Sequence, residues 1–246
     1  MVHSFTSFQD LTHFSLEPFN EILLINSNFQ EEGLTIEEVK VLLIMTQSAP
    51  GINSVKTTYS FQGLRRACNL HQARLTKALN RLITKRAIIK TPHGYELTDL
   101  GVELANKFRQ EILSNKDVEE KDHKYVAFLK TKLTNGNIDK TKLPEIYERL
   151  LGKWFANLRF YSVSYNENFL QFNWVGDIPP TVTATLSILP PNKITGYIVA
   201  KNEEQLESTV NVFVQRISQE LGATGINIEF TQPIFDYQNG MDVLAS

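Results

Sequence analysis

The chain has 246 residues, of which 42% are apolar and 21% are charged, a composition typical of a folded globular protein and not of a disordered one. No apolar run approaches the roughly 20 residues that cross a bilayer, and residues 1–12 lack the pattern of a signal peptide. The single cysteine, Cys68, excludes an internal disulfide and a cysteine-based zinc site. We therefore expect a cytoplasmic protein that makes no membrane contact.

The formal net charge of −2 hides an uneven distribution along the chain. Residues 1–38 carry seven carboxylates and no Lys or Arg, which gives −7. Residues 39–95 carry ten cations and no carboxylate, which gives +10, and residues 96–246 carry 15 cations and 20 carboxylates, which gives −5. An acid-free block inside an acidic chain indicates binding to a polyanion, with an ordinary solvated surface as the alternative.

The first elements are helical. Residues Phe5–Asn26 are rich in Phe and Leu and predict one or two short helices. The sequence Thr35-Ile-Glu-Glu38 matches a capping box, in which the hydroxyl and the carboxylate each accept from a free backbone N–H group, and it predicts a helix that runs to about Gln47. Ser60 is a candidate N-cap for a second helix over Phe61–Cys68.

The turn after the second helix contains Asn69, a residue type that tolerates a left-handed conformation. A third helix is predicted over His71–Arg86, because its apolar residues form one narrow stripe of helical period. The stripe consists of Leu75, Ala78, Leu79 and Leu82. The opposite face is polar, basic and free of acid, and it consists of Ala73, Thr76, Lys77 and Asn80, flanked by Arg74 and Arg81.

A short hairpin follows the third helix. The strands are predicted at Ile88–Thr91 and Tyr95–Thr98, and the turn at Pro92-His93-Gly94. A fourth helix is predicted from Thr98 or Asp99 to about Ser114. This order of elements is that of a helix-turn-helix with a wing.

The second half of the chain predicts a different architecture after a charged boundary at residues 114–124. Two helices are expected at Lys124–Leu133 and Lys142–Leu151, and an amphipathic helix at Glu203–Leu221. The strands are expected at Trp154–Tyr165, Phe169–Val175, Thr181–Leu189, Ile194–Ala200 and Ile226–Thr231. The fold class is therefore α+β. An N-terminal helical segment (1–34) precedes a winged helix-turn-helix domain (35–116) and a C-terminal α+β domain with an antiparallel sheet (124–246).

The residues Gly63–Ile89, followed by Tyr95–Leu104, resemble the winged helix-turn-helix of MarR-type transcriptional regulators. The most specific parts are the leucine spacing of the third helix and the Leu97-Thr98-x-x-Gly101 sequence after the wing. The sequence departs from that pattern at Arg65, where Ala is usual, and at Arg86, where Gly commonly closes the helix. The C-terminal domain also differs from the usual pair of dimerising helices.

A basic helix of this kind fits the major groove of double-stranded DNA, where polar side chains bind base edges and small apolar groups contact the thymine methyl. The candidate base-reading residues are Gln72, Ala73, Arg74, Thr76, Lys77 and Asn80, with His71 at the start of the helix. The candidate phosphate contacts are Arg65, Arg66, Arg81, Lys85 and Lys90. His93, at the tip of the wing, either reaches the minor groove or a phosphate, or lies in solvent.

The sequence favours a transcriptional regulator that acts as a homodimer, because two-fold operators match two-fold proteins. The alternative is a partner-binding or structural winged-helix subunit of a replication, chromosome-organisation or transcription complex, with the acidic segment 1–34 as its dimer or partner contact. The aromatic residues of the C-terminal domain either form its core or line a pocket for a small-molecule effector.

Enzyme chemistry has little support, because the histidines are scattered and no phosphate-binding loop is present. We expect no metal and no cofactor. Cys68 is either a small buried apolar residue or an accessible redox-sensing thiolate.

Overall fold

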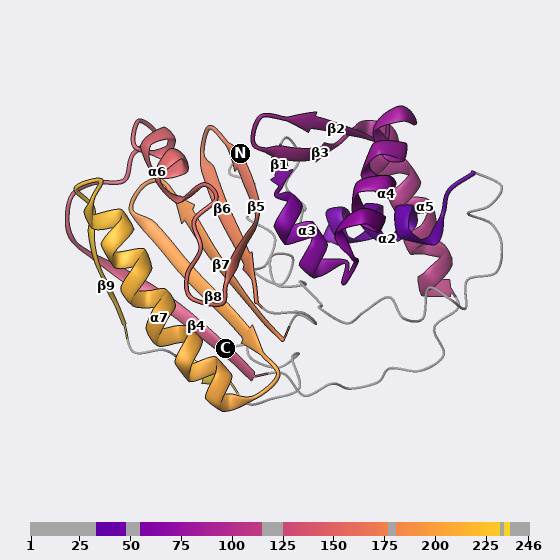
Figure 1. The fold of residues 1–246 in the computed structure, drawn as a ribbon. Coiled ribbons are helices and arrows are strands. Elements are labelled where there is room, and N and C mark those ends of the chain that lie inside the picture. Colours follow the sequence, from indigo (N-terminus) through magenta and orange to yellow (C-terminus); the bar gives the residue numbers. More distant parts are fainter. Residues whose placement is uncertain (1–32, 48–54, 115–124, 177–180, 232–233, 237–246) are drawn as a thin grey trace.

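The computed structural model describes residues 33–47, 55–114, 125–176, 181–231 and 234–236. Within these ranges the protein is of the α+β class, with six helices and ten antiparallel-paired strands (Figure 1). The helices predicted over Phe5–Asn26 lie outside the described residues. No helix among those described is both long and apolar enough to cross a membrane.

The helices of the N-terminal half are compatible with the predicted winged helix, but the strand β1 between the first two of them was not predicted. Its elements are α2 (Ile36–Gln47), β1 (Lys56–Tyr59), α3 (Phe61–Ala67), α4 (Gln72–Thr84), β2 (Ile88–Thr91), β3 (Gly94–Leu97) and α5 (Asp99–Ser114). The capping box is confirmed: Thr35 N donates to Glu38 Oε2 at 2.9 Å, and Glu38 N donates to Thr35 Oγ1 at 3.3 Å. Ser60 caps α3 by accepting from Gly63 N, and Asn69 has a φ of 49°.

The sequence Leu97-Thr98-x-x-Gly101 allows the start of α5 to pack closely against the residues that follow α4. A Cβ at Gly101 would lie 2.0 Å from the carbonyl oxygen of Ala87, so only glycine fits there. Thr98 Oγ1 donates to the Arg86 carbonyl at 2.7 Å and accepts from Gly101 N at 3.1 Å. Arg86 itself has a φ of 61°, the left-handed conformation that usually selects glycine after a helix.

The C-terminal half contains most of the strands. Its elements are β4 (Tyr125–Asn135), α6 (Leu143–Leu150), β5 (Arg159–Asn166), β6 (Phe169–Val175), β7 (Val182–Leu189), β8 (Lys193–Ala200), α7 (Glu203–Gly222), β9 (Asn227–Phe230) and β10 (Ile234–Asp236). The strand predicted from Trp154 begins only at Arg159, because residues 155–158 form a tight turn closed by the Phe155–Leu158 bridge.

The helix predicted at Lys124–Leu133 is wrong, because Tyr125–Leu133 belong to strand β4. Burial along β4 follows a period of two: Ala127 and Leu129 are buried, whereas Lys130 and Lys132 are exposed. Strand β4 pairs with β8 on one side and with β9 and β10 on the other. These long-range pairings satisfy its backbone groups and override the helix-forming composition.

One sheet runs through both halves of the molecule. Its order is β10-β4-β8-β7-β6-β5-β1-β3-β2, and β9 also pairs with β4. Strand β1 joins the halves, because it pairs with β5 from Lys56–Tyr165 to Tyr59–Ser162 and with β3 at Tyr59–Tyr95. The wing formed by β2 and β3 stands at the end of this sheet and is joined to it through β1 at the Tyr59–Tyr95 pair (Figure 1).

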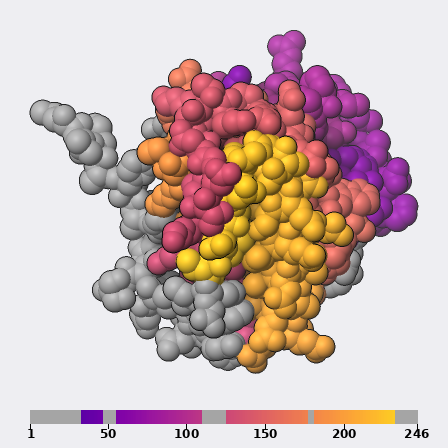
Figure 2. Space-filling model, turned by 90° about the vertical axis from the view of Figure 1, so that its left-hand side faces the viewer, coloured from indigo at the N-terminus to yellow at the C-terminus, as the bar shows by residue number. Residues whose placement is uncertain are grey.

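Two hydrophobic cores lie along this sheet. The larger core lies in the C-terminal half, where α6 and α7 cover one face of the sheet (Figure 1). Figure 2 shows these two helices at the surface of that half, with the N-terminal helices beside them. The smaller core lies among α2, α3, α4 and α5, and it also includes Tyr161 of β5 and Val175 of β6.

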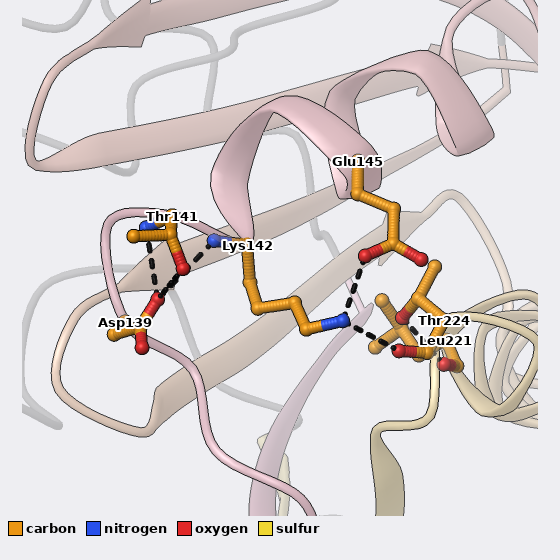
Figure 3. Close-up of polar contacts among 6 residues, drawn as sticks. All are labelled: Asp139, Thr141, Lys142, Glu145, Leu221 and Thr224. Atoms are coloured by element: carbon orange, nitrogen blue, oxygen red, sulfur yellow. Dashed lines mark hydrogen bonds and ion pairs between the residues drawn. The ribbon is translucent and has the colours of Figure 1, made fainter.

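Helix α6 is fixed at its N-terminal end by a small polar cluster (Figure 3). Asp139 Oδ1 accepts from Thr141 N at 2.8 Å and from Thr141 Oγ1 at 2.5 Å. Lys142 Nζ donates to Glu145 Oε2 at 2.8 Å and to the Thr224 carbonyl beyond α7 at 3.3 Å. The hydrogen bonds from Thr141 hold the pKa of Asp139 below its ordinary value, so the carboxylate form stabilises this arrangement.

Candidate nucleic-acid interface

The candidate recognition helix, α4, begins at His71. His71 has extended backbone angles (φ −65°, ψ 145°), and its Nδ1 accepts from Ala73 N at 3.4 Å. The imidazole thus occupies the position where Ser, Asp or Asn usually caps a helix. The first turn of α4 contains no acidic residue, so the positive end of the helix dipole faces outward without a neutralising carboxylate.

The two faces of α4 separate as the sequence predicts. The predicted stripe of Leu75, Ala78, Leu79 and Leu82 is buried. The opposite side, which we call the α4 face, is exposed at all of its residues: His71, Gln72, Ala73, Arg74, Thr76, Lys77, Asn80 and Arg81. Seven of these residues, all except Arg74, line one depression of the surface. The chain therefore presents polar, cationic and small apolar groups together along one exposed helix.

The cations at the C-terminal end of α4 contact the start of α2. Arg81 forms an ion pair with the buried carboxylate of Glu38, the same carboxylate that completes the capping box. The carbonyl oxygen of Gly33 accepts from Arg81 Nη2 at 3.3 Å and from Lys85 Nζ at 2.7 Å. These contacts were not predicted, because nothing in the sequence pairs residues 33 and 38 with residues 81 and 85.

The arginines of α3 lie in a different environment from those of α4. Arg66 Nη1 donates to the carbonyl of Gly176, at the end of β6, at 3.1 Å, and both Arg65 and Arg66 are half-buried. Helix α3 packs so tightly on β5 that a Cβ at Gly63 would lie 2.4 Å from the Cα of Tyr161. The structure therefore groups the α4 residues on one exposed face, while Arg66 reaches toward the C-terminal sheet.

Two tyrosines tie this junction to the end of α2. The hydroxyl of Tyr161 donates to the Ile44 carbonyl at 3.1 Å, and that of Tyr59 donates to the Met45 carbonyl. Both carbonyls belong to the last turn of α2, where no helical N–H group is available to them. The two rings also meet edge to face, with centroids 5.5 Å apart. These contacts couple the orientation of the helix-turn-helix to the C-terminal sheet.

The wing places its two candidate residues differently. Lys90 is exposed on β2, the last strand of the sheet. The exposed ring of His93 lies edge to face with Tyr147 of α6, with centroids 6.1 Å apart. Tyr147 in turn contacts Tyr165, and its pKa is raised mainly by burial and then by Tyr165 and Glu96. The tip of the wing therefore packs against the C-terminal half, a contact that no local sequence signal predicts.

Cys68 is fully buried at the end of α3. Burial raises the pKa of its thiol to about 12, although Lys40 acts in the opposite direction. The thiol is therefore protonated at neutral pH, which favours the structural interpretation over the redox sensor. In the described part of the chain, no group of three or more His, Cys, Asp and Glu side chains is arranged to hold a metal ion.

Most aromatic side chains of the C-terminal half belong to its core. Phe155, Phe172 and Trp174 are buried, and the Trp174 ring lies 5.5 Å from that of Phe213 on α7. Trp154 lies outside this core, because it is 56% exposed and the guanidinium of Arg159 lies 4.0 Å from its ring centroid. The aromatics therefore pack α6 and α7 onto the sheet.

Comparisons with known proteins assign no family. No family model matches the sequence, and no curated protein matches it. Among solved structures, the chain is similar to one described as the possible transcriptional regulator YydK from Bacillus subtilis, with 12% identity and a TM-score of 0.21 over 70% of this chain and 96% of that chain. At this TM-score the similarity establishes neither a shared topology nor a shared function.

Proposed function

We propose that this protein is a transcriptional regulator that binds double-stranded DNA by inserting α4 into the major groove, as the resemblance to MarR-type winged helices implies. The observation that carries the proposal is the division of α4. Its apolar stripe is buried, and its acid-free polar face is exposed over its whole length. A solvated helix of average composition would carry carboxylates among its cations, and these would repel phosphate.

The residues of the α4 face and the cations that follow it have distinct proposed roles. Gln72, Arg74, Lys77 and Asn80 carry groups that hydrogen-bond to base edges, and Ala73 is small enough to contact a thymine methyl. Lys85 and Lys90 are proposed to hold phosphates, which fixes the register of the protein on the duplex without reading sequence. Arg81 has the same proposed role, and the rest of its guanidinium would contact a phosphate while Nε keeps the ion pair with Glu38.

The C-terminal half is proposed to act as a sensing or dimerisation domain in a cytoplasmic homodimer without enzymatic activity. The proposal is supported by close contacts between the C-terminal sheet and the N-terminal helices. The tight contact of Gly63 with Tyr161 and the bond from Tyr161 to the Ile44 carbonyl join the sheet to the helix-turn-helix. A small-molecule effector that shifts β5 would therefore move α3 with it, and the spacing of two α4 helices in a dimer would change.

The test measures the affinity of the purified protein for a short duplex as a function of salt. Log affinity is expected to fall linearly with log salt. The double variant Arg74→Ala with Lys77→Ala is expected to lose about 100-fold in affinity at low salt and to show a slope smaller by roughly two. The matched control, Lys132→Ala with Lys140→Ala, removes two exposed cations from the C-terminal half and should change affinity by less than about threefold.

Equal losses in the two double variants would contradict the proposed role of α4. Sequence specificity is tested by recovery of genomic fragments on the immobilised wild-type protein and on the Arg74→Ala, Lys77→Ala variant. A regulator is expected to enrich a small set of fragments that the variant does not enrich. Uniform recovery of all fragments would leave DNA binding but contradict sequence-specific regulation.

One observation favours the second candidate function, a winged-helix module that binds a protein partner. The tip of the wing packs on α6 through His93 and Tyr147. Winged helices often place this hairpin on DNA, but here it makes a contact within the protein. In that case a duplex of any sequence would bind weakly, and neither Arg74 nor Lys77 would affect the salt dependence. The salt titration above therefore separates the two candidates.

A further inference from the structure

Residues 1–32 differ in charge from the basic helix α4, which lies next to the point where they join the described fold. They carry five carboxylates and neither Lys nor Arg. The described chain begins at Gly33, whose carbonyl accepts hydrogen bonds from Arg81 and Lys85 of the basic helix. An acidic segment is thus attached at the C-terminal end of the α4 face.

The fold already holds one carboxylate in this way. Glu38, only five residues beyond Gly33, forms an ion pair with Arg81. The side chains of Arg74 and Lys77 lie further along the same helix and are exposed. Arg74, Lys77 and Arg81 also line a second depression together with Thr35 and Glu37. The surface between the start of α2 and α4 therefore leads from Gly33 directly to the exposed cations.

The length of the segment suffices for such a contact. Helix α4 has 13 residues and is therefore about 20 Å long at 1.5 Å per residue. Roughly six extended residues, at about 3.3 Å each, span that length. Attachment next to the site raises the effective concentration of the segment to the order of millimolar, so even a weak charge interaction occupies the face.

The composition of the segment also suits this surface. Its apolar anchors are Leu11, Phe14, Phe19, Ile22 and Leu23. The α4 face offers apolar area from Ala73 and from the aliphatic stems of Lys77 and Arg81, on which aromatic side chains pack well. The carboxylates of the segment thus complement the cations of the α4 face, and its aromatic side chains complement the aliphatic stems of the face.

We propose that residues 1–32 bind the α4 face of the same chain and compete there with the phosphates of DNA. The proposal rests on the proposed DNA-binding function and adds its regulation. The carboxylates of the segment contact Arg74, Lys77 and Arg81, and DNA must displace them before α4 enters the groove. The protein is then a weaker binder than its basic helix alone implies, and its affinity falls less steeply with salt, because salt also weakens the contact of the segment.

The experiment compares three full-length proteins on one 30-base-pair duplex. The first is the wild type, and the second replaces the five carboxylates of the segment by amides. These changes are Asp10→Asn, Glu17→Gln, Glu21→Gln, Glu31→Gln and Glu32→Gln. The third is a matched control with the same change in net charge at exposed positions of the C-terminal half. Its changes are Glu148→Gln, Glu203→Gln, Glu204→Gln, Glu207→Gln and Glu229→Gln.

The segment variant is expected to bind the duplex at least about tenfold more tightly than the wild type at low salt, and the control less than about threefold more tightly. Equal gains in both variants would overturn the inference, because net charge would then explain them, and would leave the proposed function intact. If none of the three proteins binds the duplex, the proposed function fails and the competition fails with it.

A second measurement observes the segment without DNA. A fluorescent peptide of residues 1–32 is titrated into the full-length segment variant, whose own segment lacks the carboxylates. Saturable binding is expected, with about tenfold weaker binding to the wild type and to a segment variant that also carries Arg74→Ala and Lys77→Ala. If the peptide binds with the same affinity when Arg74 and Lys77 are replaced, the segment binds elsewhere and the inference is overturned.

Discussion

The two helices of the helix-turn-helix carry similar cations in different surroundings. On α3, Arg66 donates to the Gly176 carbonyl, and Gly63 lies against the backbone of β5. On α4, Arg74 and Lys77 are exposed and lie opposite a buried leucine stripe. The first helix thus fixes the motif to the C-terminal sheet, whereas the second presents groups to a ligand. Residue type alone does not distinguish an anchoring arginine from a binding one.

The largest expected effect tests the anchoring helix. Gly63→Ala places a methyl group 2.4 Å from the Cα of Tyr161. Because this Cα is a backbone atom and cannot rotate away, α3 must move off β5. We expect a loss of about 3 kcal/mol in the free energy of unfolding, measured by urea denaturation. Gly222→Ala is the control, because its added Cβ meets only the Asn227 side chain at 3.5 Å. A loss below about 1 kcal/mol for Gly63→Ala would contradict the close packing.

The next effect tests the bond between the two halves. Tyr161→Phe leaves the buried Ile44 carbonyl without its hydroxyl donor, and we expect a loss of about 2 kcal/mol in the free energy of unfolding. Tyr165→Phe is the control, because its hydroxyl makes no corresponding hydrogen bond within the described residues. If the two variants unfold at the same denaturant concentration, the hydroxyl of Tyr161 does not hold α2 to the sheet.

Single arginine variants compare the two helices directly. Arg74→Ala is expected to lower DNA affinity about tenfold at low salt and to leave the unfolding free energy unchanged, because this side chain is exposed. Arg66→Ala is expected to lower the unfolding free energy by about 1 kcal/mol with a smaller change in affinity. The reverse pattern, in affinity and denaturation measurements on both proteins, would place the DNA contact on α3.

A smaller, stabilising effect is expected at the end of α4. Arg86 has a φ of 61°, a conformation that costs a residue with a side chain about 1 kcal/mol more than it costs glycine. Arg86→Gly should therefore raise the unfolding free energy by up to about 1 kcal/mol, as the usual glycine at this position implies. Lys90→Gly, in strand β2, should instead destabilise the protein. An Arg86→Gly protein with a lower melting temperature would contradict a strained position.

The smallest effect concerns the support of α6, which carries the wing contact Tyr147. Hydrogen bonds from Thr141 hold the pKa of Asp139 below its ordinary value of 3.8. A lowered folded-state pKa contributes stability above the unfolded pKa, and that stability is lost as the pH falls through the folded pKa. Asp139→Asn should therefore flatten the acid side of the stability profile below about pH 4 and change little at neutral pH. An unchanged acid profile would show that Asp139 carries no pH-dependent stability.

The sequence by itself determined the local structure of the candidate interface. The leucine period of α4, the Thr35–Glu38 capping box, the Ser60 cap and the left-handed Asn69 all follow from interactions among residues a few positions apart. Such interactions depend on side-chain chemistry and helical spacing, which can be read directly from the chain. The exposed residues of the α4 face were predictable for the same reason.

Only the tertiary structure decided the features that join distant segments. Residues Tyr125–Asn135 carry both lysines and alternating apolar residues, and pairing on both sides made them a strand. The pairing of β1 with β5, the contact of His93 with Tyr147 and the ion pair of Glu38 with Arg81 likewise join residues far apart in sequence. Backbone pairing and close packing select among conformations that local preference leaves nearly equal in energy.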